Sequence, residues 1–520
     1  MKTISTKSNG FYPKLKVMSQ LFTITCLLTV GWLLLNTQDL SISIKPDVPL
    51  DPQCPLIVPS NSPVPENRKR LHSLLSEDHQ LIILPSSPRV TRLGGDMELP
   101  GWRQSSNIMY VLGEYSISDS YILINRTETS LAITILLPAQ SQKEIVFSGA
   151  VPDLSSIKQK YAVESVDYIT NLSNFINDHS TILSPEKGIE KLLSDQLKQS
   201  LKSKSSSVKF SEEVNELFIE SRFIKSKAEL EYLTYASQVA AISHLFINES
   251  IHKLDFVSES KLASLFEYVS TICQCRLQAY NPIVGAGSHG AVLHFPTGET
   301  DDGGNSNIGL KDLILIDAAG AFKGYASDLT RTYSRIDSER KRVLSKIVLD
   351  GQSEGIKAHK VGNNWSDVVD ATNEKLLEGL ISNNFFTTQD LKTLIDSGVI
   401  SIFTPHGIGH PVGLDVHDPV PATFKTANVT FMGLRDQYPL KLSFDYTIDI
   451  GQVHTVEPGI YFVPYLLDLA KNDESLAVAH LINWDTIDQY RGIGGVRIED
   501  VVAINYEGKS VILTKIFSSK

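Results

Sequence analysis

Leu313 to Tyr333 form the stretch LILIDAAGAFKGYASDLTRTY, which decides the fold. A strand-like apolar run ends in Asp317, a glycine-containing turn region follows, and Asp328 stands on a second strand-like run. A carboxylate that faces an apolar core is costly unless a partner or a metal ion compensates its charge. Taken alone, however, an Asp after an apolar strand is usually a turn or capping residue. The stretch therefore predicts two strands and leaves the role of their carboxylates open.

Three further stretches place ionisable side chains in similar surroundings. In TPHGIGHPVGLDVHD, glycines and a proline surround His410, which predicts a loop running into a strand rather than a helix. HTVEPGIYF holds Glu457 inside an apolar run, and GVRIEDVVAI holds Glu499 inside another. Strand alternation puts Arg497 and Glu499 on one face, so a simple buried ion pair is an alternative explanation for that stretch.

Four carboxylates and a histidine in such surroundings indicate a shared cation. Asp317, Asp328, His410, Glu457 and Glu499 offer oxygen and imidazole ligands, which suit Mn²⁺, Co²⁺ or Zn²⁺ better than a thiolate-binding metal. Four negative charges are about what two divalent ions need. Two such ions can hold a bridging hydroxide and polarise a carbonyl, so the pattern indicates hydrolytic chemistry.

The order Asp, Asp, His, Glu, Glu, together with the sequences that flank these residues, resembles that of the pita-bread metallopeptidases. The nearest branch contains the Xaa-Pro dipeptidases (prolidases) and Xaa-Pro aminopeptidases, and the similar stretches include AYNPIVGAGSHGAVLHF, DAAGAFKGYASDLTRTY and PHGIGHPVGLDVHD. The resemblance covers about residues 79–515. It implies an α+β fold, with a C-terminal pita-bread (creatinase/aminopeptidase-like) domain after a smaller mixed α/β domain. A silent peptide-binding or scaffold module on the same fold is the alternative.

The resemblance also implies roles for the five metal ligands. Asp328 and Glu499 would bridge two divalent ions, with Mn²⁺ favoured and Zn²⁺ or Co²⁺ as alternatives. Asp317 would bind one ion through both oxygens. His410 and Glu457 would complete the shell of the other ion, and Glu457 would also accept a proton from the nucleophilic water.

The remaining site residues follow from the same resemblance. His294 matches a residue that contacts the substrate and the developing oxyanion, and His417 matches a second substrate-binding histidine. His406 resembles a supporting histidine of the proline pocket or proton path. Arg497 resembles an arginine that orients the carboxylates, and Tyr280 a tyrosine beside a bridging carboxylate.

The implied substrate is a peptide with proline in second position, cleaved before the proline, or an Xaa-Pro dipeptide. Prolidases carry a basic residue before TVEPG that holds the carboxylate of a dipeptide. Here Ser443 and Phe444 fall at that place, with Arg435 offset from it, so the choice between dipeptides and longer peptides stays open. The loop TGETDDGGNSNIGLKD after His294 is long and acidic and is expected near the entrance of the site. Homodimers are common in the family.

The N-terminus predicts a membrane anchor. Residues 1–16 carry four lysines and no acidic residue, and residues 17–35 (VMSQLFTITCLLTVGWLLL) carry no charge. This favours an uncleaved single-pass signal anchor with a cytosolic tail and a luminal or extracellular catalytic part, with a cleaved signal peptide as the alternative and a mitochondrial role disfavoured. N-glycosylation sequons, a weak sign of a glycoprotein, occur at Asn125, Asn171, Asn248, Asn364 and Asn428.

The rest of the chain divides into a stem and two domains. Seven prolines between Pro46 and Pro65 predict an extended stem over 36–78, followed by an α/β domain over 79–220 and a catalytic domain over 221–520. A capping box at Ser226–Glu229 predicts a long helix to about Asn248. Further helices are expected at 258–273, 338–359 and 365–381.

The net charge and the cysteine content argue against two classes of protein, nucleic-acid-binding proteins and disulfide scaffolds. A net charge of −11 argues against nucleic acid as a main partner. Cys54, Cys273 and Cys275 lie outside the apolar segment, and their odd number argues against a disulfide scaffold. The two-residue spacing of Cys273 and Cys275 is poor for a mutual bridge, which favours buried thiols for this pair.

Overall fold

The computed structural model describes residues 54, 56–76, 80–89, 101–175, 181–183, 213–301, 303–424, 429–430, 441–442 and 444–515. None of the helices within these ranges has the length and apolar content of a membrane span. The predicted tail (1–16) and anchor (17–35) lie outside the described residues, as do Arg435 and Ser443. The anchor therefore stays a prediction.

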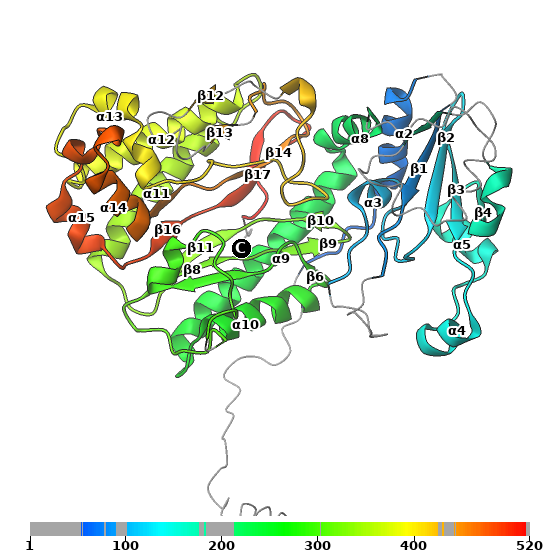
Figure 1. The fold of residues 1–520 in the computed structure, drawn as a ribbon, viewed down its shortest axis with the longest axis horizontal. Helices are drawn as coiled ribbons and strands as arrows, with labels where there is room; N and C mark the ends of the chain where they lie inside the picture. The colour runs from blue at the N-terminus through cyan, green and yellow to red at the C-terminus, as the bar shows by residue number, and fades with distance from the viewer. Residues whose placement is uncertain are drawn as a thin grey trace, which may run out of the picture. The chain divides into compact units, whose positions relative to one another are not determined.

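The N-terminal region is built on one mixed sheet with the strand order β4-β3-β2-β1-β5 (Figure 1). The inner strands β1, β2 and β3 pair antiparallel, and β4 and β5 pair parallel to their neighbours. This confirms a small mixed α/β domain. Its strands are β1 (Gln80–Pro85), β2 (Tyr121–Arg126), β3 (Leu131–Leu137), β4 (Ser165–Tyr168) and β5 (Thr181–Leu183), and its helices are α2 (Val64–Leu74), α3 (Ser106–Leu112), α4 (Gln142–Ser148), α5 (Leu154–Tyr161) and the 3-10 turn η1 (Ile169–Asn174).

Helix α2 corrects the predicted stem. It lies inside 36–78, yet its Leu71 is fully buried in the core of the N-terminal region. Proline is compatible with the first turn of a helix, because the N–H that it lacks has no partner there, and Pro65 stands at such a position. The proline count therefore misassigned a packed helix to an extended segment.

The C-terminal region packs helices against several short sheets. In Figure 1, α11 and α12 lie on one side of β14, β17 and β16, and α9 and α10 lie on the other side. The long helices are α8 (Glu213–Phe223), α9 (Lys227–Lys253), α10 (Glu259–Ile272), α11 (Glu339–Ala358) and α12 (Trp365–Ser382), and the shorter ones are α13 (Leu391–Ser397), α14 (Pro464–Asn472) and α15 (Trp484–Tyr490), with the 3-10 turns η2 (Gly287–Ala291), η3 (Val399–Ile402), η4 (Ala422–Phe424), η5 (Glu474–Leu476) and η6 (Ala479–Leu481).

The predicted helices of this region are confirmed, and the capping box at Ser226 starts α9 as expected. The strands form the sheets β10-β9-β6, β11-β8-β7, β14-β17-β18, β15-β16 and β12-β13. They are β6 (Leu277–Gln278), β7 (Ile283–Ala286), β8 (Leu313–Asp317), β9 (Gly320–Phe322), β10 (Tyr325–Ala326), β11 (Thr330–Ser334), β12 (Val429–Thr430), β13 (Lys441–Leu442), β14 (Val453–Val456), β15 (Gly459–Tyr461), β16 (Gly495–Arg497), β17 (Asp500–Ile504) and β18 (Ser510–Ile512).

A disulfide joins Cys54 to Cys273 at the end of α10, across 219 residues of sequence. Of the two predicted buried thiols, Cys273 is therefore paired, which corrects the prediction, and Cys275 is buried and free. The spacing of Cys273 and Cys275 disfavours a bridge between them. It says nothing about a partner brought in from a distant part of the chain.

Cys54→Ser is expected to lower the free energy of unfolding by about 2–5 kcal/mol, because the bridge closes a very long loop in the unfolded chain. Thermal melts with and without reductant check this. Reductant should lower the melting temperature of the wild-type protein towards that of Cys54→Ser and leave the variant unchanged. Equal melting temperatures for the two oxidised proteins would contradict a stabilising bridge.

Candidate active site

The four predicted carboxylates come together from separate breaks in the strands. Asp317 ends β8, Asp328 lies between β10 and β11, Glu457 follows β14, and Glu499 lies between β16 and β17. Asp317, Asp328 and Glu499 are 9%, 5% and 1% exposed. Donor atoms of Asp328, His410 and Glu499 all lie within 4.8 Å of one another. These three predicted residues therefore lie in one cluster.

The pairing of strands explains how Glu457 and Glu499 reach this cluster. Val456 pairs with Asp500, and Gly459 pairs with Arg497, so both glutamates lie where the two ladders are interrupted. The residue after Glu457 is a proline, which has no N–H to continue the ladder. The sequence predicted a continuous alternating strand here, whereas the structure breaks it and turns both carboxylates into the site.

His410 lies on a loop, as the glycines predicted. Its Nδ1 lies 3.1 Å from the Pro411 carbonyl, which can only accept a hydrogen bond, so Nδ1 carries the proton. Its Nε2 lies 3.4 Å from carboxylate oxygens of both Asp328 and Glu457. Gly409 allows this approach, since a Cβ there would lie 2.1 Å from the Thr455 carbonyl oxygen. His410 therefore presents Nε2 to the carboxylates.

Burial raises the pKa values of three of these acids. Desolvation raises the pKa of Asp317 and of Glu499, and it raises the pKa of Glu457 to about 7. For His410, burial favours the neutral ring, but the carboxylates of Asp328 and Glu457 outweigh it and raise the pKa to about 9. Four buried carboxylates cannot all stay ionised without compensating positive charge. The oxygen-rich donor set and its need for cations fit hard divalent metal ions.

Arg497 supplies fixed positive charge and orders the site. This residue is 4% exposed. Its Nη2 donates to Asp317, its Nε donates to the Thr330 hydroxyl over 2.9 Å, and its Nη1 donates to the Tyr461 hydroxyl over 2.8 Å. Thr330 in turn donates to Glu499 over 2.6 Å. The guanidinium therefore links two of the four carboxylates.

His406 joins this network at its outer end. Its Nδ1 lies 2.7 Å from the Gly407 carbonyl, and its Nε2 lies 2.9 Å from the Tyr461 hydroxyl. Burial, reinforced by the positive charge of Arg497, lowers the pKa of His406 to about 3. A neutral imidazole that donates from Nδ1 and accepts at Nε2 satisfies both contacts.

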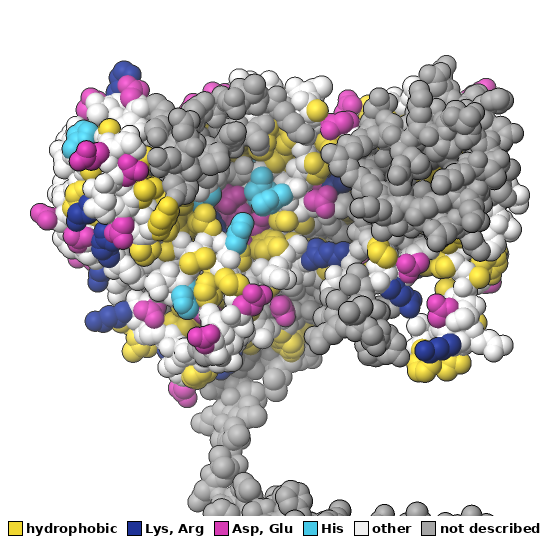
Figure 2. Space-filling view, viewed as in Figure 1, with side chains coloured by type: hydrophobic (Ala, Val, Ile, Leu, Met, Phe, Trp, Pro, Cys, Tyr) yellow, Lys and Arg dark blue, Asp and Glu magenta, His cyan; other side chains and the backbone are white. Residues whose placement is uncertain are grey.

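Tyr280, His294 and His417 line the cavity that opens on the cluster. The cavity measures about 420 Å³, and its wall includes Asp317 and Asp328. The Tyr280 hydroxyl lies within hydrogen-bond distance of both aspartates, and the His417 ring is 4.0 Å from the His410 ring. The cavity is also lined by Phe295, Pro296, Thr297 and Glu299. The acidic loop after His294 therefore borders the site. In Figure 2, histidine and acidic side chains gather near the middle of the visible face.

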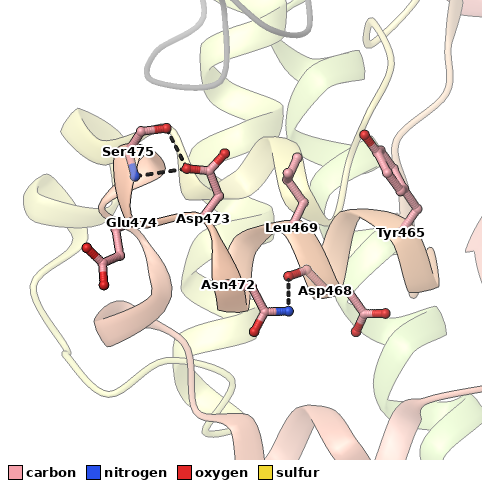
Figure 3. A pocket seen from close by; sticks show the side chains of 7 residues that line it. All are labelled: Tyr465, Asp468, Leu469, Asn472, Asp473, Glu474 and Ser475. Carbon is pink, nitrogen blue, oxygen red and sulfur yellow. Dashed lines mark hydrogen bonds between the residues drawn. The ribbon is translucent and has the colours of Figure 1, made fainter.

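A larger cavity, of about 510 Å³, lies along α14 and η5 (Figure 3). It is a shallow surface hollow. Asp473 accepts hydrogen bonds from the hydroxyl and the backbone N–H of Ser475, and Asn472 donates to the backbone of Asp468. None of the site residues predicted from sequence lines this hollow, so the smaller cavity is the candidate active site.

Three supporting residues escaped the sequence reasoning. Thr330 and Tyr461 hold Arg497, and the Thr455 hydroxyl accepts from the His410 N–H and donates to Glu457 over 3.1 Å. Thr330 follows Asp328 by two residues, and Thr455 precedes Glu457 by two. Strand alternation puts such pairs on one face, which was the available signal.

Comparison with known families matches both parts of the chain. Residues 231–506 match the model of metallopeptidase family M24, and residues 64–183 match the model of the aminopeptidase P N-terminal domain. The second match begins at α2, in agreement with the folded helix there.

Curated relatives cover most of the chain. A probable Xaa-Pro aminopeptidase of Fusarium vanettenii is 30% identical over 81% of this chain and 86% of its own length. A probable Xaa-Pro aminopeptidase of Botryotinia fuckeliana is 29% identical over 87% of this chain and 84% of its own length.

Solved structures share the fold. Aminopeptidase PepP of Pseudomonas aeruginosa is similar with a TM-score of 0.69 and 22% identity, over 87% of this chain and 95% of that chain. Zinc-substituted Escherichia coli aminopeptidase P in complex with product is similar with a TM-score of 0.69 and 23% identity, over 88% of this chain and 96% of that chain. With a family match that spans more than half of its residues, the chain belongs to metallopeptidase family M24.

Proposed function

We propose that this hydrolase removes the N-terminal residue of peptides that have proline in second position. One observation carries the proposal: Asp317, Asp328, His410, Glu457 and Glu499 converge beside a cavity of peptide-sized dimensions. The names of the curated relatives support the choice of Xaa-Pro peptides. Peptides longer than a dipeptide are favoured, because the sequence lacks the basic residue expected before TVEPG for holding a dipeptide carboxylate.

The same five residues would hold two divalent ions, with Mn²⁺ favoured over Zn²⁺ or Co²⁺. When bound, such ions supply a water molecule of lowered pKa and polarise the carbonyl that is attacked. Glu457 is the group that would accept the proton of that water. One of its oxygens accepts a hydrogen bond from the Thr455 hydroxyl over 3.1 Å, which orients the carboxylate for this role.

The other residues bind and orient. His417 and His294 lie in the cavity wall, where their ring nitrogens can donate to the substrate carbonyl as negative charge develops on it. Arg497 and Tyr280 hold Asp317 and Asp328 in place. The chain from Arg497 through Tyr461 to His406 fixes a neutral imidazole near Glu457, with 3.9 Å between His406 Nδ1 and a Glu457 oxygen.

Metal removal and peptide comparison test this function. The full chain is stripped with a chelator, reloaded with Mn²⁺, Zn²⁺ or Co²⁺, and assayed with Ala-Pro-Ala, Ala-Ala-Ala and Ala-Pro. Ala-Pro-Ala should be cleaved, Ala-Ala-Ala should be cleaved at least about 100-fold more slowly, and chelation should abolish turnover. Metal-loaded protein that binds Ala-Pro-Ala without cleaving any peptide would instead indicate a silent binding module.

A further inference from the structure

The loop that carries His417 is closed by the backbone of Asp418, a residue whose side chain is buried. The Asp418 N–H donates to the Pro411 carbonyl over 2.9 Å, which folds residues 411–418 back on themselves. Gly413 makes room for this closure, since a Cβ there would lie 2.5 Å from an Asp418 carboxylate oxygen. The loop starts next to His410 and presents His417 to the cavity. The position of Asp418 therefore sets where His417 stands.

Two buried cations hold Asp418 from outside the loop. Lys225 Nζ donates to one carboxylate oxygen over 2.9 Å, and Arg222 Nη2 donates to the other over 2.6 Å. The side chains of Lys225 and Asp418 are each 1% exposed. Arg222 also pairs with Asp415 on the same loop. Both cations come from the segment at the end of α8 and before α9, which precedes the M24 match.

The N-terminal domain completes this arrangement through α3. Ser106 donates to Asp415 over 2.6 Å, and Arg222 Nη1 donates to the Asn107 side chain over 3.1 Å. A chain of polar contacts thus runs from α3 to the two residues that flank Val416 and His417. Two positive charges face two negative charges within it, and of the two acids Asp418 is buried and Asp415 is partly exposed.

Such an arrangement fixes the geometry of the loop more than it adds to the stability of the fold. Buried ion pairs gain little over apolar residues of the same volume, because desolvation offsets their attraction, whereas their directional bonds admit one arrangement. We propose that Arg222, Lys225, Asp415 and Asp418, the charge clamp, are positioning residues that hold His417 against the substrate, so that the N-terminal domain takes part in catalysis through α3. This inference rests on the proposed Xaa-Pro peptidase function.

Matched variants test the clamp in the full, metal-loaded protein. Arg222→Met should lower kcat for Ala-Pro-Ala by about tenfold or more, at unchanged metal content. Arg335→Met is the control, because Arg335 donates to the Leu254 backbone carbonyl over 3.0 Å, and this bond involves neither α3 nor the loop. It should keep kcat even if its melting temperature falls as far. Arg222→Lys should have a kcat between those of Arg222→Met and the wild-type protein, since lysine keeps the positive charge but cannot make all the bonds of the guanidinium. Equal kcat for Arg222→Met and Arg335→Met would overturn the clamp.

If Arg222→Met fails to fold, two milder variants test the clamp in its place. Asp415→Asn and Ser106→Ala each weaken one arm, and the Asp415 side chain is 46% exposed, so both proteins should fold. Each should lower kcat about threefold or more without a change in melting temperature. Unchanged kcat in both would refute the proposal.

A readout without turnover separates this inference from the proposed function. In protein labelled with ¹³C-histidine, the His417 resonance, assigned with His417→Gln, should move in Ser106→Ala and stay in Arg335→Met. Wild-type protein that binds metal but cleaves no Xaa-Pro peptide would sink the proposed function alone. A His417 resonance unmoved by Ser106→Ala would sink the clamp.

Discussion

Asp328→Asn is expected to lower kcat/KM for Ala-Pro-Ala by at least about 10³-fold and to cut the bound metal below two ions per chain. One oxygen of Asp328 accepts from the Tyr280 hydroxyl over 2.6 Å, and the other lies 3.4 Å from His410 Nε2. The two oxygens of Asp328 thus point in different directions, one towards Tyr280 and the other towards His410, as those of a ligand shared by two ions would. Asparagine keeps the size of the side chain but removes its charge and one acceptor oxygen.

Metal per folded molecule and kcat/KM, measured on the same samples, check this expectation. Asp445→Asn is the matched control. Asp445 is half-buried and accepts two hydrogen bonds from Ser366, and it does not line the cavity. The control should keep its metal and its activity. Full activity of Asp328→Asn with two bound ions would remove Asp328 from the proposed ligand set.

The acidic cluster could be predicted because its signal is local. Asp317, Glu457 and Glu499 each interrupt an apolar run, and the penalty for burying a lone carboxylate makes such interruptions informative. The glycines beside His410 likewise predicted its loop, and Gly409 is there because Thr455 leaves no room for a side chain. What the structure adds is that these separate interruptions meet at one place.

The features that were missed depend on contacts between distant residues. Cys54 and Cys273 are 219 residues apart, and no spacing rule predicts which of three thiols will pair. Lys225 lies 193 residues before Asp418, so nothing near either residue marks their ion pair. Helix α2 was hidden for a different reason: prolines favour both extended chain and the first turn of a helix, and only the burial of Leu71 decides between them.

Arg497→Met is expected to lower kcat/KM by at least about 100-fold. As the pH is lowered, the variant is also expected to lose its metal ions at a higher pH than the wild-type protein does. Burial raises the pKa of Asp317 and of Glu457, and the positive charge of Arg497 acts in the opposite direction on both. Without Arg497 the two pKa values rise further, so the carboxylates keep their protons up to a higher pH. Because a ligand must lose its proton to bind a metal ion, protons then compete with metal over a wider range of pH.

Arg497→Lys separates the charge of this residue from its geometry. Lysine keeps a positive charge beside Asp317, so the pH at which metal is lost should stay near the wild-type value. It cannot reproduce the three bonds that the guanidinium makes to Asp317, Thr330 and Tyr461, so kcat/KM should still fall. Metal titrations at stepwise lowered pH, on all three proteins, distinguish the two effects. Identical pH dependence for Arg497→Met and the wild-type protein would show that Arg497 does not tune the protonation of the ligands, and would leave it only the task of holding Asp317 in place.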